Sequence, residues 1–192
     1  EELLVKIKEG RRTFAGITLV EPNLTLLPAY NEVCRLTHQM FDRADYKDGL
    51  DFSSSQLVGL VAPNFNLRGS IFNRSQLRDI FIPGATIAYS IFEDANIGQL
   101  DISGGHFSCN SLERCRINGF NISGSEFFEN LLQNSTFFGV SGIRNAQYVA
   151  TTAIEQVIAD RSTYEDLAST FPKHAPLVAR EIPLGTTLPD GT

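Results

Sequence analysis

A large apolar residue returns at every fifth position of this chain from Leu50 to about Val140. These centres are Phe52, Leu57, Ala62, Leu67, Phe72, Leu77, Ile82, Ile87, Phe92, Ile97, Ile102, Phe107, Leu112, Ile117, Ile122, Phe127, Leu132 and Phe137. Two residues before each centre lies a second, usually smaller residue, such as Ser70, Ala95 or Cys115. A period of five fits neither the 3.6-residue period of a helix nor the 2.0-residue period of a strand, so it indicates a repeat architecture.

The period also predicts the size of the structural unit. A short extended segment followed by a turn of roughly a right angle, repeated four times, closes a square coil of about twenty residues. Successive coils then stack at the strand spacing of ~4.8 Å, with residues twenty apart above one another. Phe52, Phe72 and Phe92 would share one inward column in this way. We therefore predict an all-β solenoid with one wide and one narrow inward position in each repeat.

This repeat resembles that of the pentapeptide-repeat family, whose units have a central Leu or Phe, a small residue two positions earlier, and polar residues elsewhere. The match covers about ninety residues, and the family's commonest unit has its clearest counterpart at Ala95-Asn96-Ile97. The chain is thus identified as a divergent, Phe-rich member. The resemblance implies a right-handed quadrilateral pentapeptide β-helix, and members of the family mostly bind other macromolecules.

The segment before the repeats predicts a capping helix. Leu3, Leu4 and Ile7 form an apolar side within residues 1–9, and Gly10 supplies a C-terminal stop. A helix here would cover the open end of the solenoid, whose backbone groups are otherwise unpaired. We expect residues 1–10 to form this cap and residues 11–143 to form the β-helix.

The five-residue rhythm is interrupted at about residues 25–49 by a predicted helical insertion. Asn31 is a plausible N-cap. One interpretation is a flap packed on the solenoid wall. The other is a recognition element, because insertions in repeat proteins often lie on the binding face. The candidate insertion contacts, at helical spacing, are Val33, Leu36, Met40 and Phe41.

Residues 144–181 are predicted to form C-terminal helices. The apolar pattern indicates an amphipathic helix at 145–160, and Ser162 and Glu165 have capping-box spacing for a second helix that ends before Pro172. A short helical turn is expected at 176–180. Residues 182–192 look like a linker or tail. Since the chain also begins without Met, we expect it to be a fragment of a longer protein.

Composition excludes several classes of function. A net charge of −6 and a pI near 5.1 argue against direct nucleic-acid binding, which requires clustered Lys and Arg. No window is long and apolar enough for a membrane span. The cysteines Cys34, Cys109 and Cys115 are odd in number and without paired spacing, so we expect reduced structural residues in a reducing compartment. That compartment is either the bacterial cytoplasm or a host cell into which the protein is delivered.

No catalytic or metal-binding set emerges from the sequence, so we expect no enzyme activity from this chain and no cofactor. His106 and Cys109 occupy outward repeat positions, whereas Cys115 occupies an inward one, so their side chains should diverge. His38 and His174 have no ligand partners nearby in sequence. The carboxylates of the repeats are expected to form a solvated wall.

Outward apolar residues are the candidate protein-binding positions. One column contains Ile71, Ile91 and Leu131 with Ser111 between them, and a second contains Val61 and Phe81. Such columns are either covered by the chain's own helices or kept for a partner. The candidate residues are Ile71, Ile91, Leu131, Phe81 and Tyr89.

These observations favour a non-enzymatic protein-binding scaffold that is a monomer rather than a dimer. The early insertion, the following helices and the linker-like end resemble the layout of bacterial secreted ubiquitin-ligase effectors, in which such a β-helix is the substrate-recognition domain. The alternative is a DNA-mimicking pentapeptide protein that binds DNA gyrase as a dimer joined through C-terminal helices. Residues 50–140, however, hold eight acidic residues against five arginines, a net charge of only −3.

Overall fold

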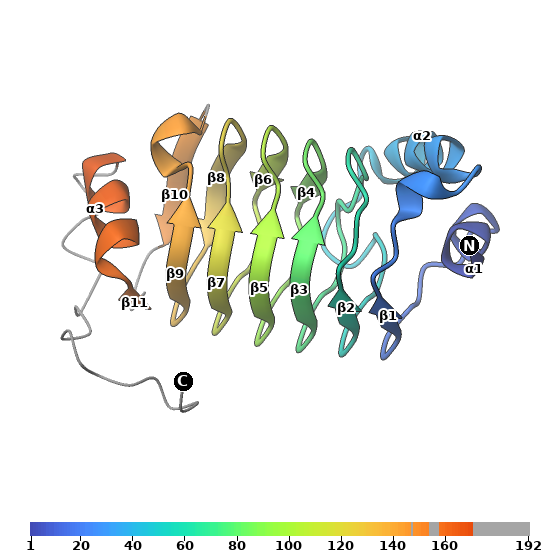
Figure 1. Cartoon of the computed structure of the whole chain (residues 1–192), viewed down its shortest axis with the longest axis horizontal. Coiled ribbons are helices and arrows are strands. Elements are labelled where there is room, and N and C mark those ends of the chain that lie inside the picture. The colour runs from blue at the N-terminus through green and yellow to red at the C-terminus, as the bar shows by residue number, and fades with distance from the viewer. Residues whose placement is uncertain (147, 154–157, 171–192) are drawn as a thin grey trace.

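The computed structural model describes residues 1–146, 148–153 and 158–170, and they form an elongated β-solenoid with a helix at each end (Figure 1). The solenoid confirms the fold class expected from the five-residue period. The helices are α1 (Glu2–Lys8), α2 (Tyr30–Phe41) and α3 (Arg161–Thr170), with short 3₁₀ turns η1 (Leu24–Leu26) and η2 (Ile143–Asn145). The strands are β1 (Thr18–Val20), β2 (Gln56–Val58), β3 (Gln76–Phe81), β4 (Thr86–Ala88), β5 (Asn96–Asp101), β6 (His106–Ser108), β7 (Arg116–Asn121), β8 (Glu126–Leu131), β9 (Thr136–Ser141), β10 (Tyr148–Ala153) and β11 (Ile158–Ala159).

The strands form two parallel sheets in which each strand pairs with the equivalent segment of the next coil. One sheet has the order β1-β2-β3-β5-β7-β9-β11, and the other has the order β10-β8-β6-β4. Leu77 pairs with Ile97, Ile97 with Ile117, and Ile117 with Phe137. These partners are twenty residues apart, so each coil holds four five-residue repeats.

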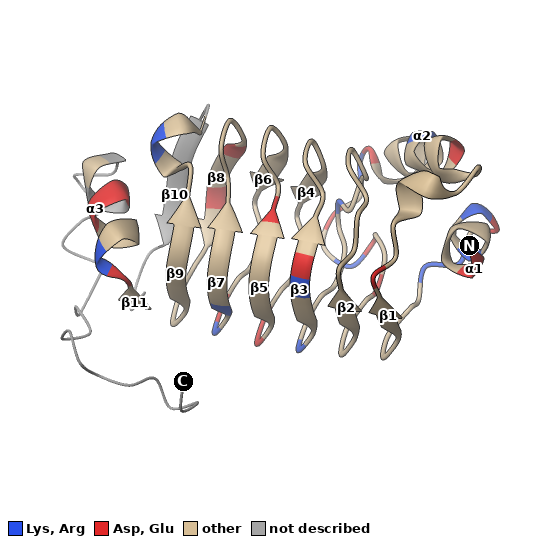
Figure 2. Ribbon diagram, in the orientation of Figure 1, with Lys and Arg blue, Asp and Glu red and all other residues tan. Residues whose placement is uncertain are grey.

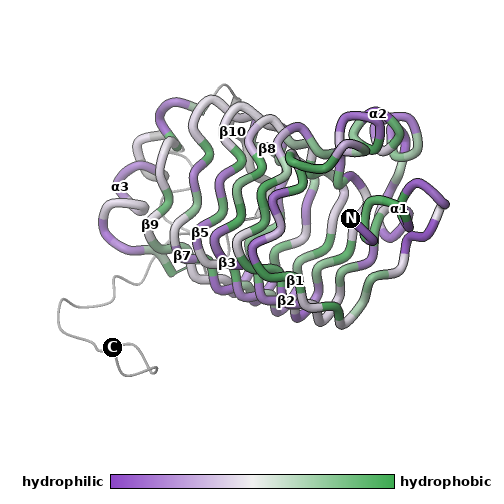
Figure 3. Tube along the Cα trace, turned by 45° about the vertical axis from the view of Figure 1, so that its right-hand side comes forward, coloured by the Kyte–Doolittle hydropathy of each residue, from purple (hydrophilic) through white to green (hydrophobic). Residues whose placement is uncertain are grey.

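The wide inward positions form the hydrophobic core. All eighteen predicted centres are at most 6% exposed. Their aromatic rings stack from coil to coil: the Phe72 and Phe92 centroids lie 4.7 Å apart, and the Phe107 and Phe127 centroids lie 5.4 Å apart. Such pairs add about 0.5–1.5 kcal/mol to the burial itself. Figure 3 shows the apolar positions of successive coils aligned in rows along the solenoid.

The narrow inward positions carry a buried polar ladder. The backbone N–H of Ser70 donates to Ser90 Oγ at 3.1 Å, and that of Ser90 donates to Asn110 Oδ1 at 2.9 Å. The N–H of Asn110 donates in turn to Asn130 Oδ1 at 3.0 Å. The Asn110 amide group also donates to the Ile87 carbonyl at 3.0 Å. Because these side chains are buried and bonded, they satisfy backbone groups at a corner that the sheets leave unpaired.

Cys115 occupies another narrow position. Its Sγ lies 2.8 Å from the Phe92 carbonyl oxygen, and its N–H donates to Ser135 Oγ at 3.0 Å. The side chain is buried, and this burial raises the pKa of the thiol to about 12. Cys115 is therefore a structural residue, as predicted.

The helix expected at the N-terminus is present as α1. Leu4 and Ile7 are buried against the first coil, so α1 covers the open end of the solenoid. Gly10 follows with a left-handed φ of +87°, a conformation that favours glycine and turns the chain into the first repeat.

The insertion contains the expected helix, α2, but this helix begins at Tyr30 and its N-cap is Ala29, so the Asn31 cap was wrong. Val33 and Phe41 are fully buried, whereas Leu36 and Met40 are partly buried. The apolar side of α2 therefore packs on the solenoid wall. Tyr30 starts the helix because its ring is buried beside Phe65 and its hydroxyl donates to the Pro63 carbonyl at 2.5 Å.

The helix predicted at 145–160 is wrong. Described residues of this segment form η2, β10 and β11, and the strands extend the solenoid: Val149 pairs with Phe127 on β8, and Ile158 pairs with Thr136 on β9. The edges of the last complete coil present unpaired N–H and C=O groups, and pairing with them overrides the helical apolar pattern. The β-branched Val149, Thr151 and Thr152 also favour a strand.

The second C-terminal helix is confirmed as α3, with a different cap from the expected Ser162. Asp160 Oδ1 accepts the Thr163 N–H at 2.7 Å, and Asp160 Oδ2 accepts the Gly139 N–H at 2.5 Å. The Thr163 hydroxyl accepts the Val140 N–H at 3.2 Å. One carboxylate thus caps the helix and binds the edge of β9. The turn expected at 176–180 and the tail at 182–192 lie outside the described residues.

Replacing Asn110 by alanine should destabilise the solenoid by about 1–3 kcal/mol, because it leaves the Ser90 N–H buried without a partner and removes the bond from the Asn110 amide to the Ile87 carbonyl. Urea denaturation followed by circular dichroism measures the change. Asn96 is an exposed asparagine in the same pair of coils, and Asn96→Ala should change the free energy of unfolding by no more than about 0.5 kcal/mol. Equal losses in the two variants would contradict the ladder.

Replacing Asp160 by alanine should lower the free energy of unfolding by about 1–3 kcal/mol, since both the cap of α3 and the hydrogen bond to β9 are lost. Thermal unfolding is the measurement. Asp160→Asn should lose less, because one oxygen remains to accept. The neighbouring Arg161→Ala removes an exposed pair with Glu165 and should change stability by about 0.5 kcal/mol or less.

Iodoacetamide at pH 8 should label Cys34 and Cys109 well before Cys115 in the folded protein. With its pKa raised to about 12, the Cys115 thiol holds roughly one part in ten thousand as reactive thiolate at this pH, and the side chain is also enclosed. Peptide mass spectrometry at timed intervals measures the order of labelling. In 8 M urea the three rates should converge. Labelling of Cys115 at the rate of Cys109 without urea would refute the buried position.

Candidate functional site

The reactive side chains near position 110 do not converge. His106 Nδ1 pairs with Glu126 Oε2 at 2.7 Å, and Cys109 Sγ lies 3.4 Å from Glu129 Oε2, both on the outside of the solenoid. Cys115 points inward. Within the described ranges, no three His, Cys, Asp or Glu side chains are placed to hold a metal ion together. The candidate positions that remain to be placed are the outward apolar residues.

The predicted column of Ile71, Ile91 and Leu131 exists as a row of β-bridges that includes Ser111. Its members project little: Ile91 is 7% exposed and Ser111 is 8% exposed, while Ile71 and Leu131 are partly buried. Neighbouring side chains of the stack therefore withdraw much of this column from solvent.

Tyr89 anchors the segment that returns from the insertion to the solenoid. Its ring lies edge-on to Tyr46 at 5.8 Å, and the Arg68 guanidinium lies 4.1 Å from its centroid. The Tyr46 hydroxyl donates to the Cys109 carbonyl at 2.6 Å. Sequence reasoning missed Tyr46, because its loop carries no periodic signal that would place it against Cys109, 63 residues further on.

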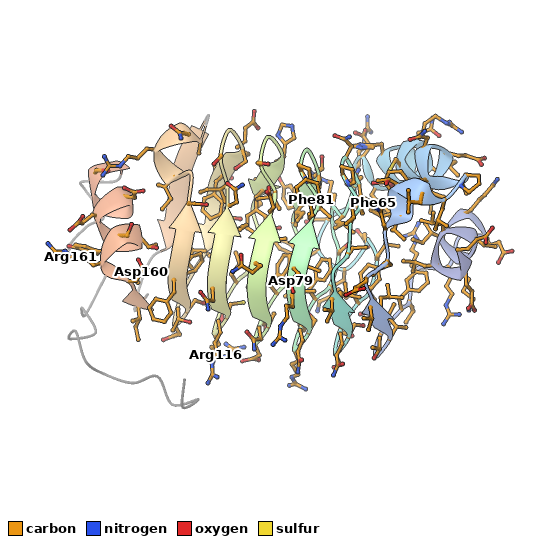
Figure 4. The ribbon with its side chains drawn as sticks, viewed as in Figure 1. Phe65, Asp79, Phe81, Arg116, Asp160 and Arg161 are labelled. Carbon is orange, nitrogen blue, oxygen red and sulfur yellow. The ribbon has the colours of Figure 1, made fainter. Side chains whose placement is uncertain are left out.

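Phe81, the last residue of β3, is the candidate residue that projects most clearly. It is 46% exposed, and its neighbours in the outward column are Val61 on one side and Asp101 on the other. Figure 4 shows Phe81 and Asp79 together on β3.

A shallow groove of about 290 Å³ begins beside Phe81 and crosses β3, β5, β7 and β9. Ile80 and Leu100, whose side chains are buried in the core, line its floor. Two outward columns flank this floor. One column contains Asp79, Gln99, Gly119 and Gly139, and the other contains Phe81, Asp101, Asn121 and Ser141. We call this the Phe81 groove.

Glycines shape one wall of the groove. Gly119 and Gly139 follow Asp79 and Gln99 in a column with left-handed φ at every member. A Cβ at Gly119 would lie 2.9 Å from atoms of the Gln99 amide, so that amide occupies the space where a side chain would be. Glycines at two outward positions twenty residues apart are a sequence signal that could have located the groove.

The groove carries carboxylates without paired cations. Asp79 and Asp101 make no ion pair with any residue of the described part of the chain. Asp101 accepts from the Ser103 N–H at 2.8 Å and from the Asn121 amide at 3.0 Å, and Asp79 is exposed. An adjoining depression of about 510 Å³ shares Asp79 and Gln99 and contains Arg78. Figure 2 shows this mixture of charge on β3.

The described helices include none with the length and apolar character needed to cross a lipid bilayer.

No protein-family model and no curated protein matches the sequence. Among solved structures, the fold is similar to that of HetL, a pentapeptide repeat protein involved in heterocyst differentiation regulation from the cyanobacterium Nostoc sp. strain PCC 7120. The TM-score is 0.46 at 17% identity, over 83% of this chain and 64% of the HetL chain.

Two further structures are similar at lower TM-scores. Rfr23, a pentapeptide repeat protein from the cyanobacterium Cyanothece 51142, gives 0.26 at 15% identity, over 82% of this chain and 97% of its own. A trypsin-treated form of QnrB1, a plasmid-mediated fluoroquinolone resistance protein, gives 0.25 at 11% identity, over 88% of this chain and 98% of its own.

The chain's own features identify its architecture. The five-residue repeat runs through the sequence, and partners twenty residues apart in the two sheets make each coil out of four repeats. The chain is therefore a β-solenoid whose coils are each built from four five-residue repeats, which is the fold expected of a pentapeptide β-helix.

Proposed function

We propose that this chain is a non-catalytic, monomeric scaffold that binds another protein through the Phe81 groove. The observation that carries the proposal is the 46% exposure of Phe81 at the mouth of the groove. Aromatic residues that project beside a depression are typical energetic centres of protein interfaces.

A stacked solenoid suits this role physically. The groove is built on strands whose inward side chains are locked in the core, so little conformational entropy is lost there on binding. Its walls are columns of residues from successive coils, which present a regular surface along the axis. The surface would therefore be largely pre-formed before the partner arrives.

The finer proposal is that the chain is the substrate-recognition domain of a larger bacterial effector. The order of its parts supports this proposal: a capping helix, an interrupted first coil, the solenoid, and then α3. Catalysis would belong to another part of the parent protein.

The alternative, a DNA-mimicking ligand of DNA gyrase, has less support. Its dimer was expected to form through a helix at 145–160, but residues 148–153 form β10. Uniform negative charge is also lacking, as Arg78 lies beside Asp79 in the depression next to the groove.

Phe81→Asp should abolish retention of the partner in pull-downs from bacterial and eukaryotic lysates, because a carboxylate replaces the apolar anchor. Leu26→Asp is the matched control, since Leu26 is 77% exposed and lies outside the groove. Circular dichroism should show both variants folded. Quantitative mass spectrometry compares the bound proteins.

Loss of the same protein with Phe81→Asp but not with Leu26→Asp supports the proposal. If the wild type and both variants retain the same protein equally, the Phe81 groove is not the binding surface. Retention of gyrase, with altered supercoiling, would support the alternative instead.

A further inference from the structure

We infer that the Phe81 groove recognises an extended segment of a partner protein in which an arginine lies two positions from an apolar residue. This inference rests on the proposed function and adds the chemistry of the partner. It follows from the charge, the shape and the order of side chains along the groove.

The charge of the groove favours a cation. Asp79 and Asp101 stand on opposite walls at neighbouring coils and have no cationic partner among the described residues. Asp101 already accepts two hydrogen bonds, but a carboxylate has about four acceptor sites. A cationic side chain that enters the groove between the two walls would therefore find unused acceptors on both sides.

Arginine fits this position better than lysine does. Its planar guanidinium has five N–H donors and can bond two carboxylates at once. It can also stack on an aromatic ring, and the exposed Phe81 lines the same groove as both aspartates. The same chain already uses this contact at Arg68 and Tyr89.

The apolar residue expected in the partner is inferred from the outward column that contains Phe81. Val61 precedes Phe81 in the outward column and Asp101 follows it, so an apolar patch lies directly before the acidic position. Neighbouring coils are ~4.8 Å apart, and two residues of extended chain span ~6.6 Å. An apolar residue on Val61 and Phe81 would thus place a side chain two positions later near Asp101.

The shape of the groove favours an extended backbone. It crosses four strands, which at ~4.8 Å per step is ~14 Å, or about four residues of extended chain. Gly139 carries no side chain on one wall, so a main chain can approach the surface there. The Gln99 amide lies across Gly119 and offers both a donor and an acceptor to a peptide backbone.

Binding of defined peptides to the full chain tests the inference. The probe is a dye-labelled peptide, Ser-Leu-Ser-Arg-Ser-Leu-Ser-Arg-Ser, and its matched forms carry Glu in place of both Arg or Ala in place of both Leu. Fluorescence anisotropy at low salt should show binding of the Arg form, weaker binding of the Ala form, and none of the Glu form. High salt should weaken binding, because the charges are accessible to solvent.

Variants locate the contact. Asp79→Asn/Asp101→Asn should weaken binding of the Arg peptide about fivefold or more, while the asparagine at 101 can still accept from Ser103. The control Glu9→Gln/Asp42→Asn removes the same charge outside the groove and should bind like the wild type. Phe81→Ser should also weaken binding.

Three outcomes overturn the inference: no binding of the Arg peptide up to about 1 mM, equal binding of the Glu peptide, or equal loss in the control variant. If the lysate partner still depends on Phe81 in any of these cases, the proposed scaffold function stands and only the chemistry assigned to its partner fails.

Discussion

The structure depends on a coil length of twenty residues. This length brings each inward side chain above a residue of its own kind, so that Phe72 stacks on Phe92 and Ser90 bonds to Asn110. It also aligns the backbone groups that form the parallel sheets. Inserting or deleting one residue in a coil would place polar positions over apolar ones. Both the hydrophobic core and the hydrogen-bonded ladders would then be lost.

The same alignment organises the outside of the molecule. Because outward positions also repeat every twenty residues, a surface feature grows as a column: Phe81 leads to Asp101, Asn121 and Ser141. The Phe81 groove lies between two such columns, and two glycines shape the column on its other side. A regular core thus leaves the outward residues free to determine what the surface binds.

Sequence reasoning succeeded where a local pattern and the final contact coincide. The centres, the narrow positions, α1, α2 and α3 were all predicted from residues close in sequence. It failed at 145–160, where the apolar pattern suited a helix but the edges of β8 and β9 offered hydrogen bonds to a strand. It also overrated Ile91, because the spacing that places a residue outward does not show how closely its neighbours in the stack enclose it.

The sequence by itself determined the repeat, the coil length and the inward residues, since a period of five has one regular solution that buries every centre. Only the tertiary structure decided which outward residues are accessible, how the insertion packs around Tyr89, and that Asp160 joins α3 to β9. These features depend on contacts that each occur once in the chain and do not recur every twenty residues. A repeated pattern reports the interactions that repeat, and the groove, the insertion and the C-terminal cap each occur once.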